Sequence, residues 1–204
     1  SGTTLSTDDV GKYASVAVDL NGKAHLSYFD ATNYQLLYSS NSESADGSFS
    51  STIVESASGT EVPGWYSNIE LDDNSDSHIS YTMVDPTNQF GTVRYATGNP
   101  DDGFTITDIQ STVARSNDYP GLFSTGIALN PVDQTEVFIG YNIYGSSFVS
   151  GGNAIRFSDN TSGSFLSSVG FYPSPDDFVG FGKINVAVGS NGLVHIVSDW
   201  YFDN

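Results

Sequence analysis

A repeat of about 50 to 60 residues runs through the chain and constrains its fold more than any other feature. When Val16, Ile69, Ile127 and Val186 are taken as equivalent positions, the repeat recurs at steps of 53, 58 and 59 residues. Each copy begins with a short alternating apolar stretch, which predicts a half-buried β-strand. In the first and fourth copies an Asn-Gly pair follows that stretch, and this pair is a strong signal for a tight β-hairpin.

Each complete repeat unit is expected to contain four short strands. Four strands in a unit of this length are typical of a β-propeller blade. The sequence therefore predicts a single all-β domain over residues 1–204, a β-propeller of about four four-stranded blades. The units span about residues 9–60, 61–117, 118–176 and 177–204. Residues 1–8 are expected to form an outer closing strand, so that the last blade is composite and, lacking a third strand, incomplete.

Composition excludes several functional classes. The 204 residues include 24 acids and only 6 lysines and arginines, which gives a formal net charge of −18 at pH 7. So few bases cannot form the basic surface that binds nucleic acid, nor hold the chain on an anionic membrane. No apolar stretch is long enough for a membrane-spanning helix, so no membrane insertion is expected. The absence of cysteine excludes disulfides and thiolate chemistry.

The repeat resembles a known one. The first copy reads Gly11-x-Tyr13-x-Ser15-Val16-Ala17-Val18-Asp19-x-x-Gly22-x-x-His25-x-Ser27-Tyr28 and ends in Leu37-Tyr38. This pattern resembles the repeat of secreted bacterial sialidase-like β-propellers, and the resemblance covers nearly the whole chain. It implies a propeller fold and a secreted, extracellular location.

The resemblance does not extend to sialidase catalysis. The Ser-x-Asp-x-Gly-x-Thr-Trp turn of these repeats is matched only in part, at residues 46–49 and 102–104. The resemblance implies that an active member needs three converging arginines, and the arginines here are Arg94, Arg115 and Arg156. Arg94 and Arg156 share one position in successive blades, so they are expected to point alike in separate blades. Fold analogy alone does not supply a function.

Three histidines, His25, His78 and His195, share one repeat position, where the third unit has Phe138. A three-histidine zinc site would need them to converge, whereas equivalent strands stand about one blade apart. The favoured interpretation is structural: a hydrogen bond between strands or blades through one ring nitrogen.

An acid precedes each inner strand, close to an apolar residue and a glycine. Four carboxylates around a central channel could hold a cation such as Ca²⁺. Alternatively, each acid accepts N–H bonds within its own turn, which the sequence favours. A second calcium candidate, residues 72–76, aligns with the hairpin turn at 19–23 and is also interpreted as a turn. The four acids of the first candidate are Asp9, Glu61, Asp118 and Asp177.

The connections between second and third strands vary most, and variable loops on a rigid scaffold commonly carry binding residues. They combine aromatic rings with Asp and Asn, a combination that commonly holds glycans. The alternative is that these residues only form turns and cover blade edges. The candidate ligand-binding residues are Asp30, Asn33, Tyr34, Asp85, Asn88, Phe90, Asn142, Tyr144, Phe148, Asp199, Trp200 and Tyr201.

Three functions remain open at this point. No Gly-x-Ser-x-Gly elbow, phosphate loop or dinucleotide fingerprint occurs, so a non-enzymatic, extracellular binding or adhesion module for a glycan or a protein is favoured. The first alternative is a glycoside-hydrolase-type propeller, or part of one, with two carboxylates near the channel. The second is a structural subunit whose unfinished blade is completed by strand addition from a second copy or another chain.

Overall fold

The computed structural model describes residues 8–85, 87, 90–114, 124–143, 154–171 and 180–201. Within these ranges the regular secondary structure consists of β-strands alone. The first sheet contains β1 (Val10–Val18), β2 (Ala24–Asp30), β3 (Gln35–Ser40) and β4 (Ser50–Ser56). The second contains β5 (Val62–Leu71), β6 (Ser77–Asp85), β7 (Phe90–Asn99) and β8 (Gly103–Ala114). The third contains β9 (Thr125–Leu129), β10 (Val137–Ile143), β11 (Ala154–Asp159) and β12 (Leu166–Phe171), and the last contains β13 (Gly180–Val188) and β14 (Val194–Tyr201).

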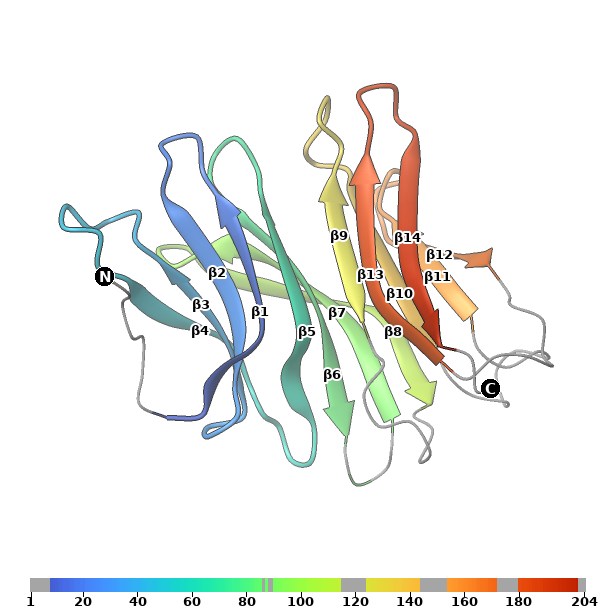
Figure 1. Ribbon diagram of the computed structural model, residues 1–204, viewed down its shortest axis with the longest axis horizontal. Coiled ribbons are helices and arrows are strands. Elements are labelled where there is room, and N and C mark those ends of the chain that lie inside the picture. The colour runs from blue at the N-terminus through green and yellow to red at the C-terminus, as the bar shows by residue number, and fades with distance from the viewer. Residues whose placement is uncertain are drawn as a thin grey trace.

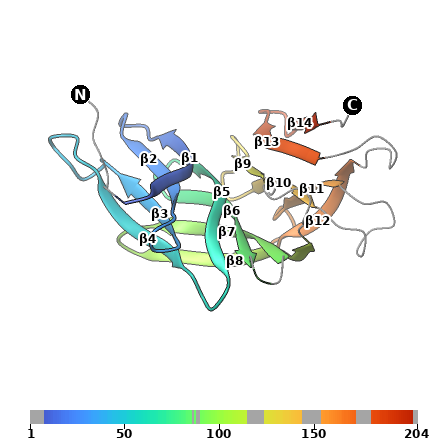
Figure 2. The same ribbon diagram turned by 60° about the horizontal axis from the view of Figure 1, so that its bottom comes forward.

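Each sheet is an antiparallel meander in chain order, which is the blade predicted from the repeat. The inner strands β1, β5, β9 and β13 lie side by side, and the sheets fan out from them as an open arc (Figures 1 and 2). The predicted β-propeller is therefore confirmed, and within the described residues the last sheet has only its two inner strands. The closing strand predicted from the N-terminus falls on residues 1–7, outside the described ranges, apart from Asp8. No helix in the described part of the chain is long and apolar enough to cross a bilayer.

Apolar side chains from adjacent blades fill the interfaces. Leu36 and Tyr38 of the first blade pack with Ile69, Ile79 and Tyr81 of the second, and each is at most 3% exposed. Burial of a side chain of this size contributes about 1.5–3 kcal/mol. The second interface repeats the pattern with Val93, Tyr95, Ile127, Ile139 and Tyr141. Packing between blades therefore provides the core.

A pair of hydroxyl groups recurs beside the inner strands at the first two interfaces. Ser27 Oγ donates to Ser67 Oγ at 3.0 Å, and at the next interface Ser80 Oγ and Thr125 Oγ1 are 3.0 Å apart. Both pairs are buried, and Ser67 and Thr125 each also donate to a backbone oxygen of the preceding blade, so these hydroxyls are hydrogen-bonded where water is excluded.

The third interface replaces this hydroxyl pair by an apolar contact. Ile184 stands where the earlier blades have Ser67 and Thr125, and Gly140 stands opposite it. A Cβ atom on Gly140 would lie 3.0 Å from Cγ2 of Ile184 and 2.8 Å from Cγ2 of Val186. The glycine is therefore explained by the larger side chains that the neighbouring blade presents.

Candidate binding site in the propeller channel

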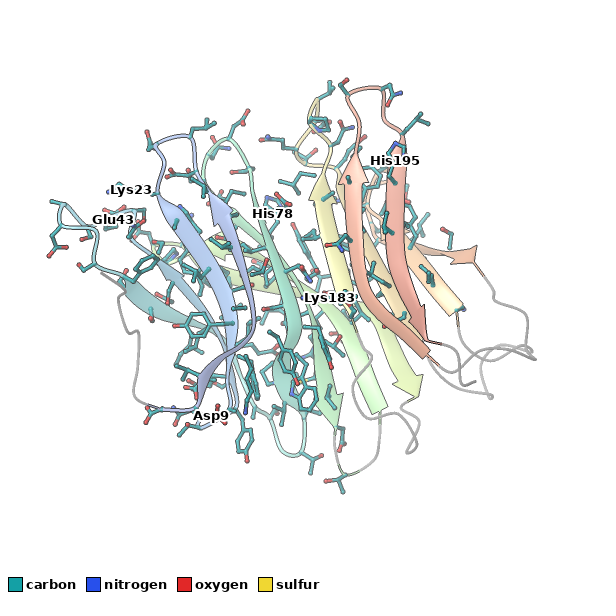
Figure 3. The ribbon with its side chains drawn as sticks, in the orientation of Figure 1. Asp9, Lys23, Glu43, His78, Lys183 and His195 are labelled. Carbon is teal, nitrogen blue, oxygen red and sulfur yellow. The ribbon has the colours of Figure 1, made fainter. Side chains whose placement is uncertain are left out.

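A cavity of ≈ 480 Å³ opens between the inner strands of all four blades. Lys183 marks its position among these strands in Figure 3. Its lining combines aromatic, hydroxyl, amide and ammonium groups, which is the composition of a polar ligand site rather than of a dry core. The lining residues are Tyr13, Ala14, Tyr66, Ser67, Asn68, Ser124, Thr125, Lys183, Ile184 and Asn185.

Two tyrosines reach the cavity from irregular points in their strands. Tyr13 and Tyr66 have φ angles of 56° and 53°, in the left-handed region that non-glycine residues rarely adopt. Gly11 and Gly64, two residues earlier, also have positive φ, and the β1–β2 and β5–β6 registers shift at these points. Such conformations cost about 1–3 kcal/mol each and gather at functional sites. The repeated Gly-x-Tyr bulge is therefore a strained feature directed at the channel.

An aromatic cluster holds these tyrosines in place. The ring centroids of Tyr13 and Tyr66 are 4.4 Å apart, and Trp65 lies 5.5 Å from Tyr13. Phe29 completes the cluster at 6.3 Å from Tyr13. Rings at these separations stabilise one another, so two aromatic edges of the channel are fixed before any ligand arrives.

Hydrogen bonds between blades orient the polar part of the lining. Ser67 Oγ donates to the backbone oxygen of Tyr13 at 3.0 Å, and Thr125 Oγ1 donates to that of Tyr66 at 2.9 Å. Asn68 Nδ2 donates to the backbone oxygens of Thr125 and Tyr66, which leaves the amide oxygen as the group that this side chain can offer. The side chains of Lys183 and Asn185 are exposed.

The predicted ligand residues of the first blade form a turn. Asp30 Oδ1 accepts bonds from the N–H groups of Thr32 and Asn33, and Asp30 Oδ2 accepts a bond from Asn33 Nδ2 at 2.8 Å. Hydrogen bonding to the carboxylate lowers the pKa of Asp30 despite its burial, which acts in the opposite direction. Tyr34 is 53% exposed beside them. Asp30 and Asn33 thus have the turn role that the sequence left as the alternative.

Several other predicted ligand residues lie within strands, where the sequence placed them in loops. Asp85 ends β6 and accepts hydrogen bonds from Thr60 and Thr87. Asn142 is 1% exposed in β10, and Phe90 begins β7. Asp199, Trp200 and Tyr201 belong to β14. The correction has a simple cause: the antiparallel pairing extends to these residues and shortens the connections.

None of the described candidates lines the channel cavity. Asn88, Tyr144 and Phe148 lie outside the described residues.

The acids proposed as a cation site are described only in part. Asp9 forms an ion pair with Lys12, with 2.5 Å between Oδ2 and Nζ, and lies at the end of the first blade far from Lys183 (Figure 3). Glu61 pairs with Ser58 through its backbone. Asp118 and Asp177 lie outside the described residues. The described residues contain no group of three or more acids or histidines placed to hold a metal ion.

His25 and His78 have the structural role that the sequence favoured. His25 Nδ1 lies 2.6 Å from Tyr38 Oη, and His78 Nδ1 lies 2.6 Å from Tyr95 Oη. Burial lowers the pKa of both imidazoles, although nearby aspartates act in the opposite direction. Burial also raises the pKa of Tyr95 to about 12. At neutral pH both pairs are therefore uncharged bonds between the second and third strands.

One charged cluster was not predicted. Arg94 donates from Nη1 to Glu55 Oε1 at 2.5 Å and from Nε to Asp108 Oδ1 at 2.6 Å. Tyr81 Oη donates to Glu55 Oε2 at 2.6 Å, which joins the first two blades. Burial and the charge of Glu55 raise the pKa of Tyr81. Arg94 is therefore a structural residue, whereas Arg115 lies outside the described residues.

Comparison with known proteins supports the fold. No protein-family model matches this sequence, and no curated protein matches it either. Among solved structures, the chain is similar to an α-L-arabinofuranosidase of Fusarium graminearum in complex with arabinobiose, with 11% identity and a TM-score of 0.62. It is also similar to an α-L-arabinanase of Penicillium chrysogenum in complex with arabinobiose, with 12% identity and a TM-score of 0.60.

The extent of these matches limits what they show. Each covers 93% of this chain but only 56% and 57% of the respective solved structures, so the chain spans little more than half of their length. At such identities the likeness shows the fold alone. It supports a propeller fold that glycoside hydrolases also use, and it does not support a specifically sialidase-like repeat.

Proposed function

We propose that this chain recognises a glycan in the channel cavity between its inner strands. The observation that carries the proposal is the meeting of tyrosine rings with amide and ammonium groups around one cavity. A sugar ring presents C–H groups on its faces and hydroxyls at its edge, so it binds where an aromatic face adjoins hydrogen-bonding groups. Tyr13 and Tyr66 supply the aromatic face, and Asn68, Lys183 and Asn185 supply the polar groups. The role belongs to an extracellular binding module.

The volume of the cavity and the net charge of the chain limit the class of ligand that the site can bind. A cavity of ≈ 480 Å³ lies within the usual range for small-ligand sites and suits one or two sugar rings. The chain carries a net charge of −18, which disfavours the approach of anions. Neutral oligosaccharides are therefore favoured over acidic ones. Arabinobiose, which is bound in both similar solved structures, is the first probe to use.

The test compares two tyrosines of similar backbone geometry. Isothermal titration with arabinobiose, and with cellobiose as a second neutral disaccharide, measures the affinity of the unchanged chain, of Tyr66→Ala and of Tyr34→Ala. Tyr34 also has a left-handed φ, 55°, but stands on the outer turn after β2. We expect Tyr66→Ala to weaken binding by roughly tenfold or more and Tyr34→Ala to leave it unchanged.

A second variant separates binding from packing. Tyr66 also packs against the interface of the second and third blades, whereas Asn185 is exposed. Asn185→Ala is therefore expected to weaken binding without altering the thermal unfolding midpoint. Loss of binding in Tyr34→Ala alone would place the site at the outer turn. If the unchanged chain binds neither arabinobiose nor cellobiose, the proposal is contradicted for both sugars.

Hydrolysis is the second candidate function, favoured by the two glycoside hydrolases that share the fold. Glu70 follows Asn68 by two residues in the regular part of β5, so both side chains leave the same side of the strand. Partial loss of hydration raises the pKa of Glu70, which is the direction that a general acid needs, although this side chain is exposed and is not among the residues that line the cavity. Release of arabinose from arabinobiose by the unchanged chain, and its loss in Glu70→Gln, would establish this function. No release, together with normal binding, would leave recognition as the role.

A further inference from the structure

A second cavity, of ≈ 450 Å³, opens between the hairpin turns at one end of the first two blades. Lys23 and Glu43 lie together at this end of the first blade (Figure 3). The cavity shares no lining residue with the channel, so a ligand bound here would be independent of glycan binding there. It is called the hairpin cavity below and is defined by the connections at residues 19–23, 42–43, 74–76 and 99–102.

Acidic side chains stand on both walls of the hairpin cavity. Among the described residues, five carboxylates and one ammonium group, that of Lys23, belong to the lining. Lys23 Nζ already donates to the backbone oxygen of Ser44 at 3.0 Å. The cavity therefore carries an excess of negative charge that attracts cations. The carboxylates are those of Asp19 and Glu43 on the wall from the first blade, and of Asp76, Asp101 and Asp102 on the wall from the second.

A buried histidine nitrogen in this cavity lacks a hydrogen-bond partner. His25 is 2% exposed and belongs to the lining, and its Nδ1 lies 2.6 Å from Tyr38 Oη. The opposite nitrogen, Nε2, has no hydrogen-bond partner among the described residues. It faces Asp19 Oδ2 at 3.6 Å, which is beyond hydrogen-bond distance. A buried polar atom left in this way is costly, so it points to a group that binds from outside.

The gap between these two atoms indicates which kind of group fits. An N–H at Nε2 would draw the carboxylate to about 2.7–2.9 Å, so the observed gap fits a ring that carries its proton on Nδ1 and donates it to Tyr38. His25 Nε2 and Asp19 Oδ2 are then two neighbouring acceptors. Asp19 Oδ1 is held by the backbone N–H groups of Asn21 and Lys23, which fixes the carboxylate. An ammonium group can donate to both acceptors at once.

The wall from the second blade offers a place for another positive group. Asn99 Nδ2 donates to Asp76 Oδ1 at 2.6 Å and to Asp102 Oδ2 at 3.2 Å, which holds these two carboxylates near each other. A bare metal ion does not fit, because no three acids or histidines of the described residues are placed to hold one. The lining also contains the rings of Tyr38 and Pro100, which an apolar chain can contact.

We propose that the hairpin cavity binds a linear diamine or polyamine, with one ammonium group at each wall. Such a ligand carries positive charge at both ends of a methylene chain, which matches carboxylates on two walls and apolar rings in the same lining. One ammonium group donates to His25 Nε2 and Asp19 Oδ2, and the other lies at the acids of the second blade. The volume of ≈ 450 Å³ is within the usual range for small-ligand sites.

Isothermal titration with spermidine at about 50 mM sodium chloride tests the proposal, because low salt preserves ionic contacts between exposed groups. The double variant Glu43→Gln/Asp101→Asn removes one carboxylate from each wall, and both side chains are exposed. We expect its affinity for spermidine to fall about tenfold. Propylamine, which has a single ammonium group, should bind the unchanged chain about tenfold or more weakly than spermidine. Equal affinity for the two amines would overturn the two-ended site.

A matched control separates the cavity from the net charge of the chain. The double variant Asp133→Asn/Asp159→Asn also removes two charges, but from turns of the third blade. Each of these aspartates accepts the backbone N–H of a threonine two residues later through Oδ1, and an asparagine oxygen accepts the same bond. The control should bind spermidine as the unchanged chain does. Equal weakening in the two double variants would overturn the proposal, because it would show attraction to net charge alone.

Nitrogen-15 NMR of the imidazole rings places the ligand. At neutral pH, Nε2 of His25 should resonate as a nitrogen without a proton, and spermidine should shift this resonance. His78 is not part of the lining and should keep its resonance. A proton on Nε2 of His25 in the free chain would overturn the proposal, and so would a His25 resonance that saturating spermidine leaves in place.

Discussion

At the scale of single residues, one pair of equivalent positions inside the blades holds a hydrogen-bonded pair in one blade and an aromatic pair in another. His25 is bonded to Tyr38 in the first blade, and the third blade has Phe138 stacked on Phe157 at the same two positions, with ring centroids 5.8 Å apart. An imidazole–phenol bond and an aromatic stack thus occupy equivalent space. The third blade therefore indicates that the first blade can accept phenylalanine at both positions.

Replacing His25 and Tyr38 together by phenylalanine should preserve the fold and reduce its sensitivity to acid. Burial lowers the pKa of His25, so the unfolded chain takes up a proton that the folded chain refuses. The resulting stability is present above the unfolded pKa of about 6.5 and is lost as pH falls toward the folded pKa. His78 contributes in the same direction.

Urea unfolding at about pH 7.5 and about pH 5.5 measures this effect, because carboxylates titrate mainly below that window. The double variant should lose roughly half of the destabilisation that the unchanged chain shows between these values. An unchanged pH dependence would show that His25 is not a source of it.

Glu55→Gln should destabilise the chain by roughly 2–3 kcal/mol, because it removes the charge that faces Arg94 in a mostly enclosed contact between blades. The side chains of Glu55 and Arg94 are only 14% and 16% exposed. Asp108, the other partner of Arg94, is 51% exposed, so Asp108→Asn should cost less than about 1 kcal/mol. Urea unfolding midpoints compare the two variants. Equal losses of stability in the two variants would contradict the claim that the Glu55–Arg94 pair contributes more than the exposed Asp108–Arg94 pair.

At the scale of elements, the inner strands β1 and β5 share a bulge that contains a glycine with a positive φ angle. Gly11 and Gly64 have φ angles of 96° and 94°, at the same repeat position. Their surroundings differ, because a Cβ atom on Gly64 would lie 3.1 Å from Cα of Leu36, whereas one on Gly11 would meet nothing within 4 Å. The backbone conformation is therefore common to both strands, and the close approach belongs only to the interface.

Alanine at these two glycines separates the two effects. Gly11→Ala should cost about 1 kcal/mol, the penalty for a left-handed backbone. Gly64→Ala should cost about 1–3 kcal/mol more, because the added methyl group also pushes the first blade away. Thermal unfolding of both variants gives the difference, and equal costs would show that the two blades yield without strain at this contact.

At the scale of the whole molecule, the repeat was sufficient to predict the architecture. The steps between Val16, Ile69, Ile127 and Val186 predicted the four successive sheets, and the last of them has two strands within the described residues. Hairpin signals such as Asn21-Gly22 placed the strands because they act locally.

The channel site was not predicted, because its residues come from inner strands that meet only when the blades curve into an arc. The loop residues predicted to bind a ligand, such as Asp30, form hydrogen bonds within their own turns instead. A usable signal was present: the Gly-x-Tyr pattern recurs at Tyr13 and Tyr66, and two left-handed tyrosines at one repeat position indicate a shared purpose.

The channel as the binding site is the central claim, and hydrogen–deuterium exchange with and without saturating arabinobiose tests it most directly. Binding in the channel should slow exchange at residues 13–14, 66–68, 124–125 and 183–185, which come from four different blades. The outer strands β4 and β8 should exchange unchanged. Protection confined to the turn at residues 31–34, or no protection at saturation, would contradict the account.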